Sequence, residues 1–292
     1  SGIHGVSRNG YGYLNNNSKH ERNPRREREN KKMSRIGLQM YTLRDYMKTP
    51  EDFRETVRKV AEIGIKHVQI TPPGYFSIEE TAKILKDNGV SADSVFRPTT
   101  HVAESIEGAK RDAEILGVDV LRTDSIPGEM RNDADGYRRY AEIMNAEGRA
   151  CKAAGLRYIY HFHAFEWITF GDERGIDILR NETDPDAVMF QPDVFWLTNA
   201  GTEPSTSLKL FEGRAFWMHV KDYAIKKLEG KIEDVPYHFA SVGTGNLNWP
   251  GILRTADEIG IERFVIEQDM CEGDPFEAVK VSYDNLVKMG IR

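Results

Sequence analysis

The residues best suited to chemistry lie in one short stretch, 158–167, which reads YIYHFHAFEW. It starts after Gly155 as an apolar and aromatic run, a pattern typical of a buried strand. Alternate residues of a strand share one face, so His161 and His163 should point the same way, and Glu166 follows where the strand gives way to a loop. Imidazole and carboxylate groups placed together in this way can bind a metal ion or transfer protons.

Three later runs of the same kind also end in groups that bind metals, namely Asp193, His219 and Glu267. If the strands are parallel and consecutive, their ends are neighbours in space, so we expect these three side chains and Glu166 to converge. Three carboxylates and an imidazole at one buried point repel one another unless a cation joins them. Oxygen-rich ligation with a single nitrogen predicts a divalent metal ion, Mn²⁺ first, with Mg²⁺, Co²⁺ or Zn²⁺ as alternatives.

The elements that would position these residues alternate along the chain. Eight short apolar runs, which we expect to be strands, are separated by amphipathic stretches of helical periodicity. The runs lie at 36–41, 67–70, 90–96, 118–121, 157–162, 188–191, 215–220 and 264–267. Parallel neighbours need a helical crossover, so the alternation predicts the α/β class and a single (β/α)8 TIM barrel. The first strand-to-helix turn has no GxGxxG phosphate loop, which argues against an open dinucleotide-binding sheet.

Charge divides the chain into two parts. Residues 1–35 hold nine Lys or Arg and three Glu, whereas the whole chain of 292 residues has a net charge of −6, so the remainder is acidic. An acidic body argues against a nucleic-acid partner. We expect residues 1–32 to be a disordered or vector-derived leader and residues 33–292 to be the barrel. Because no apolar run is long enough to cross a bilayer and no secretory signal is visible, we expect a cytoplasmic protein without a membrane partner.

Six motifs together resemble one family. They are IGLQMYTLRD at 36–45, VAEIG at 60–64, HFHAFEW at 161–167, HVKD at 219–222, VGTG at 242–245 and IEQD at 266–269. In their order and their positions at successive strand ends, they resemble the xylose isomerase-like family of sugar phosphate isomerases and epimerases over nearly all of 36–292. The resemblance implies a TIM barrel that acts on a small sugar or sugar derivative in carbohydrate metabolism.

The resemblance also implies a metal set and a mechanism. The family's Glu-Asp-His-Glu metal ligands correspond to Glu166, Asp193, His219 and Glu267. In epimerases of this kind, the two glutamates also act as acid and base on either side of the sugar. The implied activity is that of an isomerase or epimerase, in which Glu267 or Glu166 removes a proton next to a carbonyl to form a metal-stabilised enediolate. His163 and Lys221 would polarise oxygens or relay protons.

Further side chains at the strand ends are candidates for binding the substrate. Arg97 and Arg122 could hold a phosphate or carboxylate through paired hydrogen bonds, and aromatic rings could stack on a sugar face. The expected substrate-binding set is Gln39, Tyr41, Arg97, His161, Trp167 and Trp196. By fold-level analogy alone, such barrels also pair into homo-oligomers.

The chain departs from the family pattern near its first histidine. Many relatives read His-Asn-His-Asp-Phe-Glu, whereas Phe162 and Ala164 replace the Asn and Asp here. The strand-five glutamate of sugar epimerases usually occupies the position of His161, so a ligand role for Glu166 requires the loop to fold back. His161 and His163 therefore stay open as alternative metal ligands or bases.

Other functions are open on the same fold. A lyase begins with the same proton abstraction, either as a keto-inositol dehydratase or as a 3-keto-C-glycoside deglycosidase-like subunit. An apurinic endonuclease-like protein would need more histidine ligands for a trinuclear zinc cluster and a basic groove, and the acidic barrel shows neither. A non-catalytic subunit would be expected to lack ligands, whereas all four expected ligands are present.

Overall fold

The strands that carry the candidate residues lie side by side around a closed barrel. The computed structural model describes residues 34–225 and 237–292, and the expected leader 1–32 lies outside them. One parallel sheet has the order β10 (Trp217–Val220), β13 (Arg263–Ile266), β1 (Ile36–Gln39), β2 (His67–Gln69) and β3 (Ser91–Ala92). A second has the order β4 (Val95–Phe96), β5 (Val120–Asp124), β6 (Arg157–His161) and β9 (Val188–Gln191).

The first junction between the two sheets is a broken strand. The expected continuous strand 90–96 divides into β3, which pairs with β2, and β4, which pairs with β5. Asp93 lies at the break and forms an ion pair with Arg263 of β13, and its Oδ1 atom is 3.4 Å from Nδ1 of His67 in β2, an imidazole whose pKa burial lowers to about 4. Gly37 of β1 lies between them, and a Cβ there would be 3.3 Å from the Oδ2 atom of Asp93. The break therefore lets a buried carboxylate reach a cation on β13, although β2 and β1 lie between β3 and β13 in the sheet.

The second junction lies between β9 and β10. Asp193, just after β9, and His219, in β10, form an isolated parallel bridge, and the backbone N–H of His219 donates to the carbonyl oxygen of Pro192 at 2.8 Å. Because β3 and β4 together form one broken strand, the two described sheets make a closed barrel of eight parallel strands. The predicted (β/α)8 barrel is therefore confirmed. Two of the residues that the sequence singles out thus lie at the seam of the barrel.

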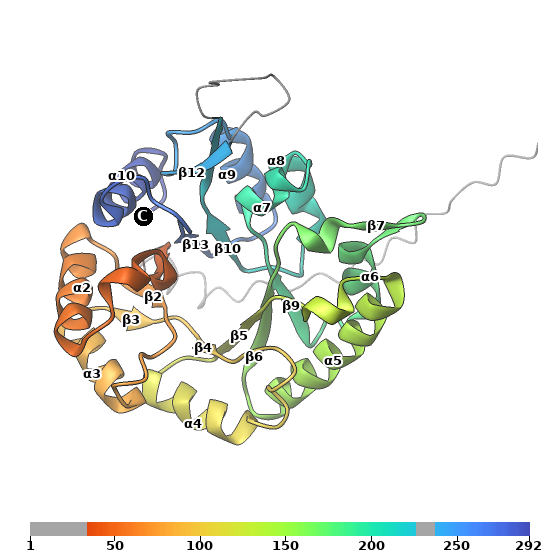
Figure 1. Ribbon diagram of the computed structural model, residues 1–292, viewed down its shortest axis with the longest axis horizontal. Coiled ribbons are helices and arrows are strands. Elements are labelled where there is room, and N and C mark those ends of the chain that lie inside the picture. Colours follow the sequence, from red (N-terminus) through yellow and green to blue (C-terminus); the bar gives the residue numbers. More distant parts are fainter. Residues whose placement is uncertain (1–33, 226–236) are drawn as a thin grey trace, which may run out of the picture. The chain divides into compact units, whose positions relative to one another are not determined.

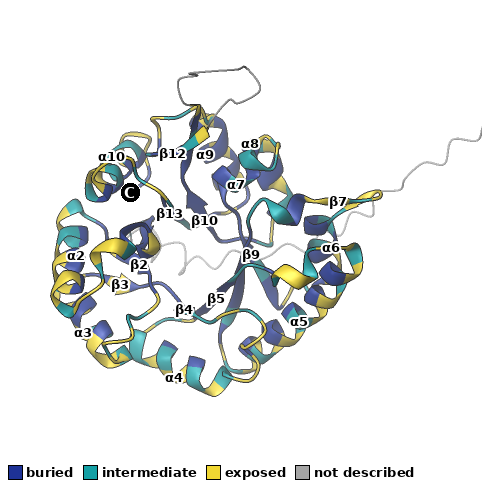
Figure 2. Cartoon of the chain, viewed as in Figure 1, coloured by how far each residue is buried: buried dark blue, intermediate teal, exposed yellow. Residues whose placement is uncertain are grey.

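Helices cover the outside of this barrel, as Figure 1 shows. The longer ones are α2 (Pro50–Ile63), α3 (Ile78–Asp87), α4 (Ile106–Leu116), α5 (Ala134–Ala153), α6 (Gly175–Glu182), α9 (Trp249–Glu258) and α10 (Pro275–Lys288). Shorter helical segments are η1 (Met40–Tyr46), η2 (Gly128–Met130), η3 (Phe165–Trp167), α7 (Val194–Asn199), α8 (Pro204–Ser207) and η4 (Leu208–Phe211). Their buried sides face the strands and their exposed sides face outward (Figure 2). None of the helices in the described ranges has the length and apolar character that a membrane span requires.

Side chains inside the barrel change from apolar to polar along the strands. Near the strand starts, Val120, Ile159 and Trp217 belong to a small buried hydrophobic cluster. Because side chains alternate across a strand, the next residues on the same face lie two positions further on. These are Arg122, His161 and His219, all buried. The polar residues are therefore gathered at the carboxyl ends of the strands, where TIM barrels place their sites.

A hairpin that the sequence pattern did not predict follows β10. It consists of β11 (Asp222–Ile225) and β12 (Tyr237–Ala240), which pair antiparallel, and a second small ribbon pairs β7 (Thr169–Phe170) with β8 (Glu173–Arg174). The buried Asp222 carboxylate accepts hydrogen bonds from the backbone N–H groups of Gly243 and Gly245 and from the indole N–H of Trp249, at 2.6–3.0 Å. A Cβ at Gly245 would lie 2.4 Å from Asp222 Oδ1. Asp222 thus holds the loop that contains the 242–245 motif against the hairpin.

Two glycines inside helices allow a direct test of how α5 packs on β9. A Cβ at Gly148 of α5 would lie 2.7 Å from the carbonyl oxygen of Ala187, which precedes β9, whereas a Cβ at Gly108 of α4 has no neighbour closer than 3.9 Å. We expect Gly148→Ala to lower the free energy of unfolding by about 1–3 kcal/mol through overpacking. Gly108→Ala should raise it by up to about 1 kcal/mol through helix propensity. Urea denaturation measures both, and equal effects of the two substitutions would contradict the packing described.

Candidate metal centre

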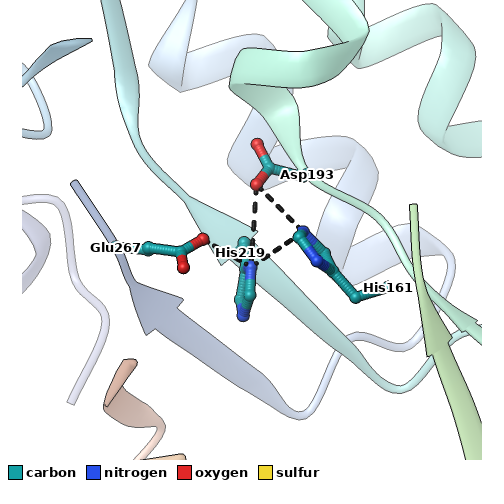
Figure 3. A group of neighbouring side chains, drawn as sticks. All are labelled: His161, Asp193, His219 and Glu267. Carbon is teal, nitrogen blue, oxygen red and sulfur yellow. Dashed lines mark hydrogen bonds and ion pairs between the residues drawn. The ribbon is translucent and has the colours of Figure 1, made fainter. Parts of the chain in front are cut away.

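Four buried side chains converge at the carboxyl ends of β6, β9, β10 and β13. They are His161, Asp193, His219 and Glu267, and one potential ligand atom from each lies within 4.8 Å of all the others (Figure 3). The Nδ1 atom of His219 is 2.9 Å from Glu267 Oε2, 3.0 Å from His161 Nε2 and 3.6 Å from Asp193 Oδ2. The Nε2 atom of His161 is 3.3 Å from Asp193 Oδ2. Three of the expected ligands and His161 therefore share one centre.

The donor atoms of this centre fit a divalent metal ion. Ligands bonded at about 2.0–2.2 Å to one ion lie about 3.0–3.5 Å from one another, close to the separations observed. The Oε2 atom of Glu267 is buried and faces the other candidate ligand atoms, 2.9 Å from His219 Nδ1, with the Lys221 ammonium as its cation partner. Two imidazole nitrogens and two carboxylate oxygens suit Zn²⁺, Mn²⁺ or Co²⁺. The donor set is richer in nitrogen than the sequence predicted, because His161 takes the fourth place.

The backbone around Asp193 aims its carboxylate at the centre. Asp193 is the N-cap of α7, and its Oδ1 atom accepts hydrogen bonds from the backbone N–H groups of Phe195 at 2.9 Å and Trp196 at 3.2 Å. N-capping satisfies one oxygen and fixes the side chain. The other oxygen, Oδ2, is left facing the two histidines. A short helix that the sequence pattern did not predict therefore orients one candidate ligand.

A buried lysine lies against the same carboxylates. Lys221 Nζ is 3.0 Å from Asp193 Oδ2, 2.6 Å from Glu267 Oε2 and 2.8 Å from Asp269 Oδ2. Burial alone would lower the pKa of Lys221, but these carboxylates outweigh burial and raise it well above its usual value. The ammonium thus stays charged. Three carboxylates and one ammonium leave two formal negative charges, which a divalent ion would neutralise.

Glu166, expected as the fourth ligand, does not reach the centre. The loop folds back into η3, where Glu166 Oε2 accepts a hydrogen bond from the backbone N–H of His163 at 2.9 Å and Oε1 accepts one from the Tyr160 hydroxyl. Tyr160 points outward from β6, on the face opposite to His161. The loop therefore carries the Glu166 carboxylate behind the strand, and His161 occupies the place at the centre.

The other expected site residues divide into two groups. His163 and Trp196 lie beside the centre, because the His163 ring is 4.6 Å from that of His161 and Lys221 Nζ is 5.3 Å from the Trp196 ring. Buried nitrogens of both, Nδ1 of His163 and Nε1 of Trp196, find no hydrogen-bond partner in the described part of the chain. These two side chains can therefore meet a substrate.

The side chains of the second group either lie away from the centre or are already paired with other residues. Arg97 is bound to Asp112 of α4 at 2.6 Å, and Trp167 packs against Phe162 and Arg174. Tyr41 is half exposed. Arg122 is buried inside the barrel, 3.3 Å from Asp124, which leaves it nearer to the centre than Arg97.

Three residues to which the sequence pattern gave no role also lie at or next to the centre. Asp269 pairs with Lys221, Gln69 lies next to His219, and Gln191 pairs with Gln69. The alternation of strand side chains could have indicated Gln191, since it lies two residues before Asp193 on the same face. A glutamine carries no charge and is not a typical metal ligand, so the contact between Gln69 and His219 could be recognised only in the folded structure.

The comparison with protein families agrees with this geometry. The family model of the xylose isomerase-like TIM barrel matches residues 57–279. The chain belongs to this family. The resemblance that the sequence motifs suggested is therefore confirmed, as is the fold that it implied.

Individual members of the xylose isomerase-like family match at lower similarity. A curated inosose dehydratase from Clostridium beijerinckii is 27% identical over 173 residues, which cover 52% of this chain and 57% of that protein. The chain thus spans little more than half the length of the curated relatives it matches. A solved sugar phosphate isomerase/epimerase from Parabacteroides distasonis has a TM-score of 0.75 at 22% identity and covers 89% of this chain and 96% of its own.

A further solved structure, the IOLI protein with a bound zinc atom, has a TM-score of 0.65 at 14% identity and covers 88% of this chain and 97% of its own. At these identities, both solved structures show the shared fold. The zinc is a property of the IOLI structure.

The buried position of Glu166 predicts a pH dependence of stability. Burial raises its pKa from 4.5 to about 7, although hydrogen bonds from Tyr160 and from the His163 backbone oppose the shift. Because the folded pKa is raised, the protonated carboxyl contributes stability that is present below pH 4.5 and is lost as the pH rises through 7. Relative to Glu166→Gln, the free energy of unfolding of the wild type should fall by about 3 kcal/mol as the pH rises across this range.

Chemical denaturation of both proteins at several pH values measures this difference. The two proteins can differ in unfolding free energy by a constant amount because the substitution rearranges hydrogen bonds. Only the part of the difference that changes with pH reports the titration of Glu166. A difference that stays constant from pH 4.5 to pH 8 would contradict the raised pKa.

Proposed function

We propose that this chain is a divalent-metal-dependent lyase that removes water from a keto-inositol or a related keto-sugar. The observation that carries the proposal is the buried convergence of His161, Asp193, His219 and Glu267, with two negative charges left uncompensated. Curated relatives named inosose dehydratase, three of them from Clostridium, support the class of reaction. Mn²⁺ is the first ion to test, with Zn²⁺, Co²⁺ and Mg²⁺ as alternatives.

The proposed reaction is an elimination that needs no oxidant or reductant. A C–H bond next to the carbonyl breaks and its proton passes to a base on the protein. The C–O bond on the adjacent carbon then breaks, and the hydroxyl leaves with a proton as water. When bound, a divalent ion would supply the positive charge that polarises the carbonyl.

The chain's own residues divide this work by position. His163 is the candidate base, because its Nδ1 atom is buried beside the centre without a hydrogen-bond partner in the described ranges. Lys221 holds its proton and places an ammonium between three carboxylates, from which it can stabilise negative charge on the substrate. Trp196 closes the side of the site next to both of them.

An isomerase or epimerase is the second candidate, since it begins with the same removal of a proton. An epimerase needs two proton-transfer groups on opposite faces of the substrate, and the expected pair was Glu166 and Glu267. The carboxylate of Glu166 is bound to Tyr160 and to the His163 backbone instead. Glu267 alone of the two glutamates faces the centre, which favours the lyase.

Two variants separate metal binding from proton transfer. Glu267→Gln removes a charged ligand, so we expect it to lose most of the metal that elemental analysis finds in the wild type, about one ion per chain. His163→Gln should keep the metal but slow exchange of the substrate's α-proton with solvent deuterium about 100- to 10,000-fold. A wild type that takes up no ion from Mn²⁺, Co²⁺, Mg²⁺ or Zn²⁺, or a His163→Gln variant with unchanged exchange, would refute the respective assignment.

The type of reaction is decided by its product. With an inosose as substrate, mass spectrometry should show the loss of one water and the absorbance should rise as a conjugated or diketone product forms. A product of unchanged mass and altered stereochemistry by NMR would instead identify an isomerase or epimerase. The same assay with open-chain ketoses and 3-keto glycosides tests the breadth of the substrate class.

A further inference from the structure

Three buried glutamines form a polar layer directly beneath the candidate metal centre. Gln39, Gln69 and Gln191 come from β1, β2 and β9, and all three are almost or fully inaccessible to solvent. Gln69 and Gln191 form a reciprocal amide pair, with each side-chain nitrogen 3.3 Å from the oxygen of the other. Buried amides require hydrogen-bond partners, so this layer must have a definite orientation.

The layer contacts one candidate ligand, His219, on the side away from the centre. Figure 3 shows one ring nitrogen of His219 facing Asp193 and His161 and the other pointing away from them. The nitrogen that points away is Nε2, and it lies 2.8 Å from the Oε1 atom of Gln69. The identity of the Gln69 atom at this contact therefore decides which nitrogen of the neutral ring carries the proton.

A backbone N–H group sets the direction of the whole network. The N–H of Tyr41 can only donate, and it donates to Oε1 of Gln39 at 3.3 Å. The side-chain nitrogen of Gln39 then faces Gln69 Oε1 at 3.5 Å, where it requires an acceptor. Turning the Gln69 amide over would place two NH₂ groups against each other. Gln69 thus presents oxygen to His219, which places a proton on Nε2 and leaves Nδ1, 2.9 Å from Glu267 Oε2, as the nitrogen that a metal ion would take.

We propose that Gln69, oriented by Gln39, is a positioning residue that holds His219 in the Nε2–H tautomer so that Nδ1 offers its lone pair to a metal ion. This inference rests on the metal centre of the proposed function. Groups behind a histidine ligand fix its tautomer and ring orientation and raise metal affinity. Gln69 acts through His219 and does not itself reach the cluster.

Three substitutions in the same layer test the assignment. Gln69→Met fills the space but removes the acceptor, so we expect it to weaken binding of Mn²⁺ or Zn²⁺ about 10- to 100-fold in calorimetric titrations. Gln69→Glu keeps an acceptor and should retain the affinity. Gln191→Met is the matched control, because Gln191 is as deeply buried but leaves the contact between Gln69 and His219 intact. If Gln69→Met does not fold, Gln69→Asn withdraws the amide by one methylene.

A second measurement reads the tautomer without metal or substrate. Long-range ¹H–¹⁵N spectra of histidine-labelled, metal-free protein distinguish the two ring nitrogens, and they are recorded over a range of alkaline pH because the carboxylates of Glu267 and Asp193 outweigh burial and raise the pKa of His219. His219→Asn assigns the signal. We expect the Nε2–H form in the wild type, in Gln69→Glu and in Gln191→Met, and an added Nδ1–H population in Gln69→Met.

The outcomes separate this inference from the proposed function. A wild type with the ring proton on Nδ1 would overturn the inference, as would a Gln69→Met variant that keeps both the Nε2–H form and the wild-type metal affinity. If the wild type binds no ion, the proposed metal chemistry fails, and the tautomer spectra alone judge the role of Gln69.

Discussion

The structure depends on how the barrel accommodates buried negative charge at its carboxyl end. Asp193, Glu267 and Asp269 all approach one ammonium group, that of Lys221. Carboxylates removed from water are stable only when cations or donors satisfy them, and one ammonium cannot neutralise three. The remaining charge matches a divalent ion, and the separations between the four candidate ligand atoms match the size of one. Electrostatics and geometry therefore indicate the same kind of occupant.

This charged centre coincides with the seam of the barrel. Asp193 and His219 form the isolated bridge between β9 and β10, and Asp193 also caps α7. A ligand that serves as both a bridge and a helix cap has little freedom to rotate, so the centre is preorganised by the fold. The glutamine layer adds the same constraint to His219 from below. A metal centre built from rigid elements in this way can polarise a substrate without rearranging.

Much of this arrangement follows from the sequence. The alternation of apolar runs and amphipathic helices predicts the barrel, and the position of a residue at a strand end predicts that Asp193, His219 and Glu267 meet. The sequence did not decide whether His161 or Glu166 is the fourth candidate ligand. Period-two alternation places His161 inside the barrel, but the path of the chain after β6 depends on where Tyr160 and the His163 backbone can satisfy a buried carboxylate.

Other features depended on contacts between distant segments and could not be derived from local patterns. The third strand breaks at Asp93, where the carboxylate pairs with the guanidinium of Arg263, 170 residues away in the sequence. The hairpin after β10 is stabilised by Asp222, whose partners are Gly243, Gly245 and the indole of Trp249 at the start of α9. Local periodicity indicates which residues are buried, but it does not identify which buried polar groups will pair.

The central claim is that His161, Asp193, His219 and Glu267 hold one divalent ion, and anomalous diffraction from crystals soaked in Mn²⁺ or Zn²⁺ tests it most directly. We predict a single strong peak about 2.0–2.3 Å from Nε2 of His161, Oδ2 of Asp193, Nδ1 of His219 and Oε2 of Glu267. A soaked crystal with no peak among these atoms, or with a peak bound by Glu166 instead of His161, would contradict it.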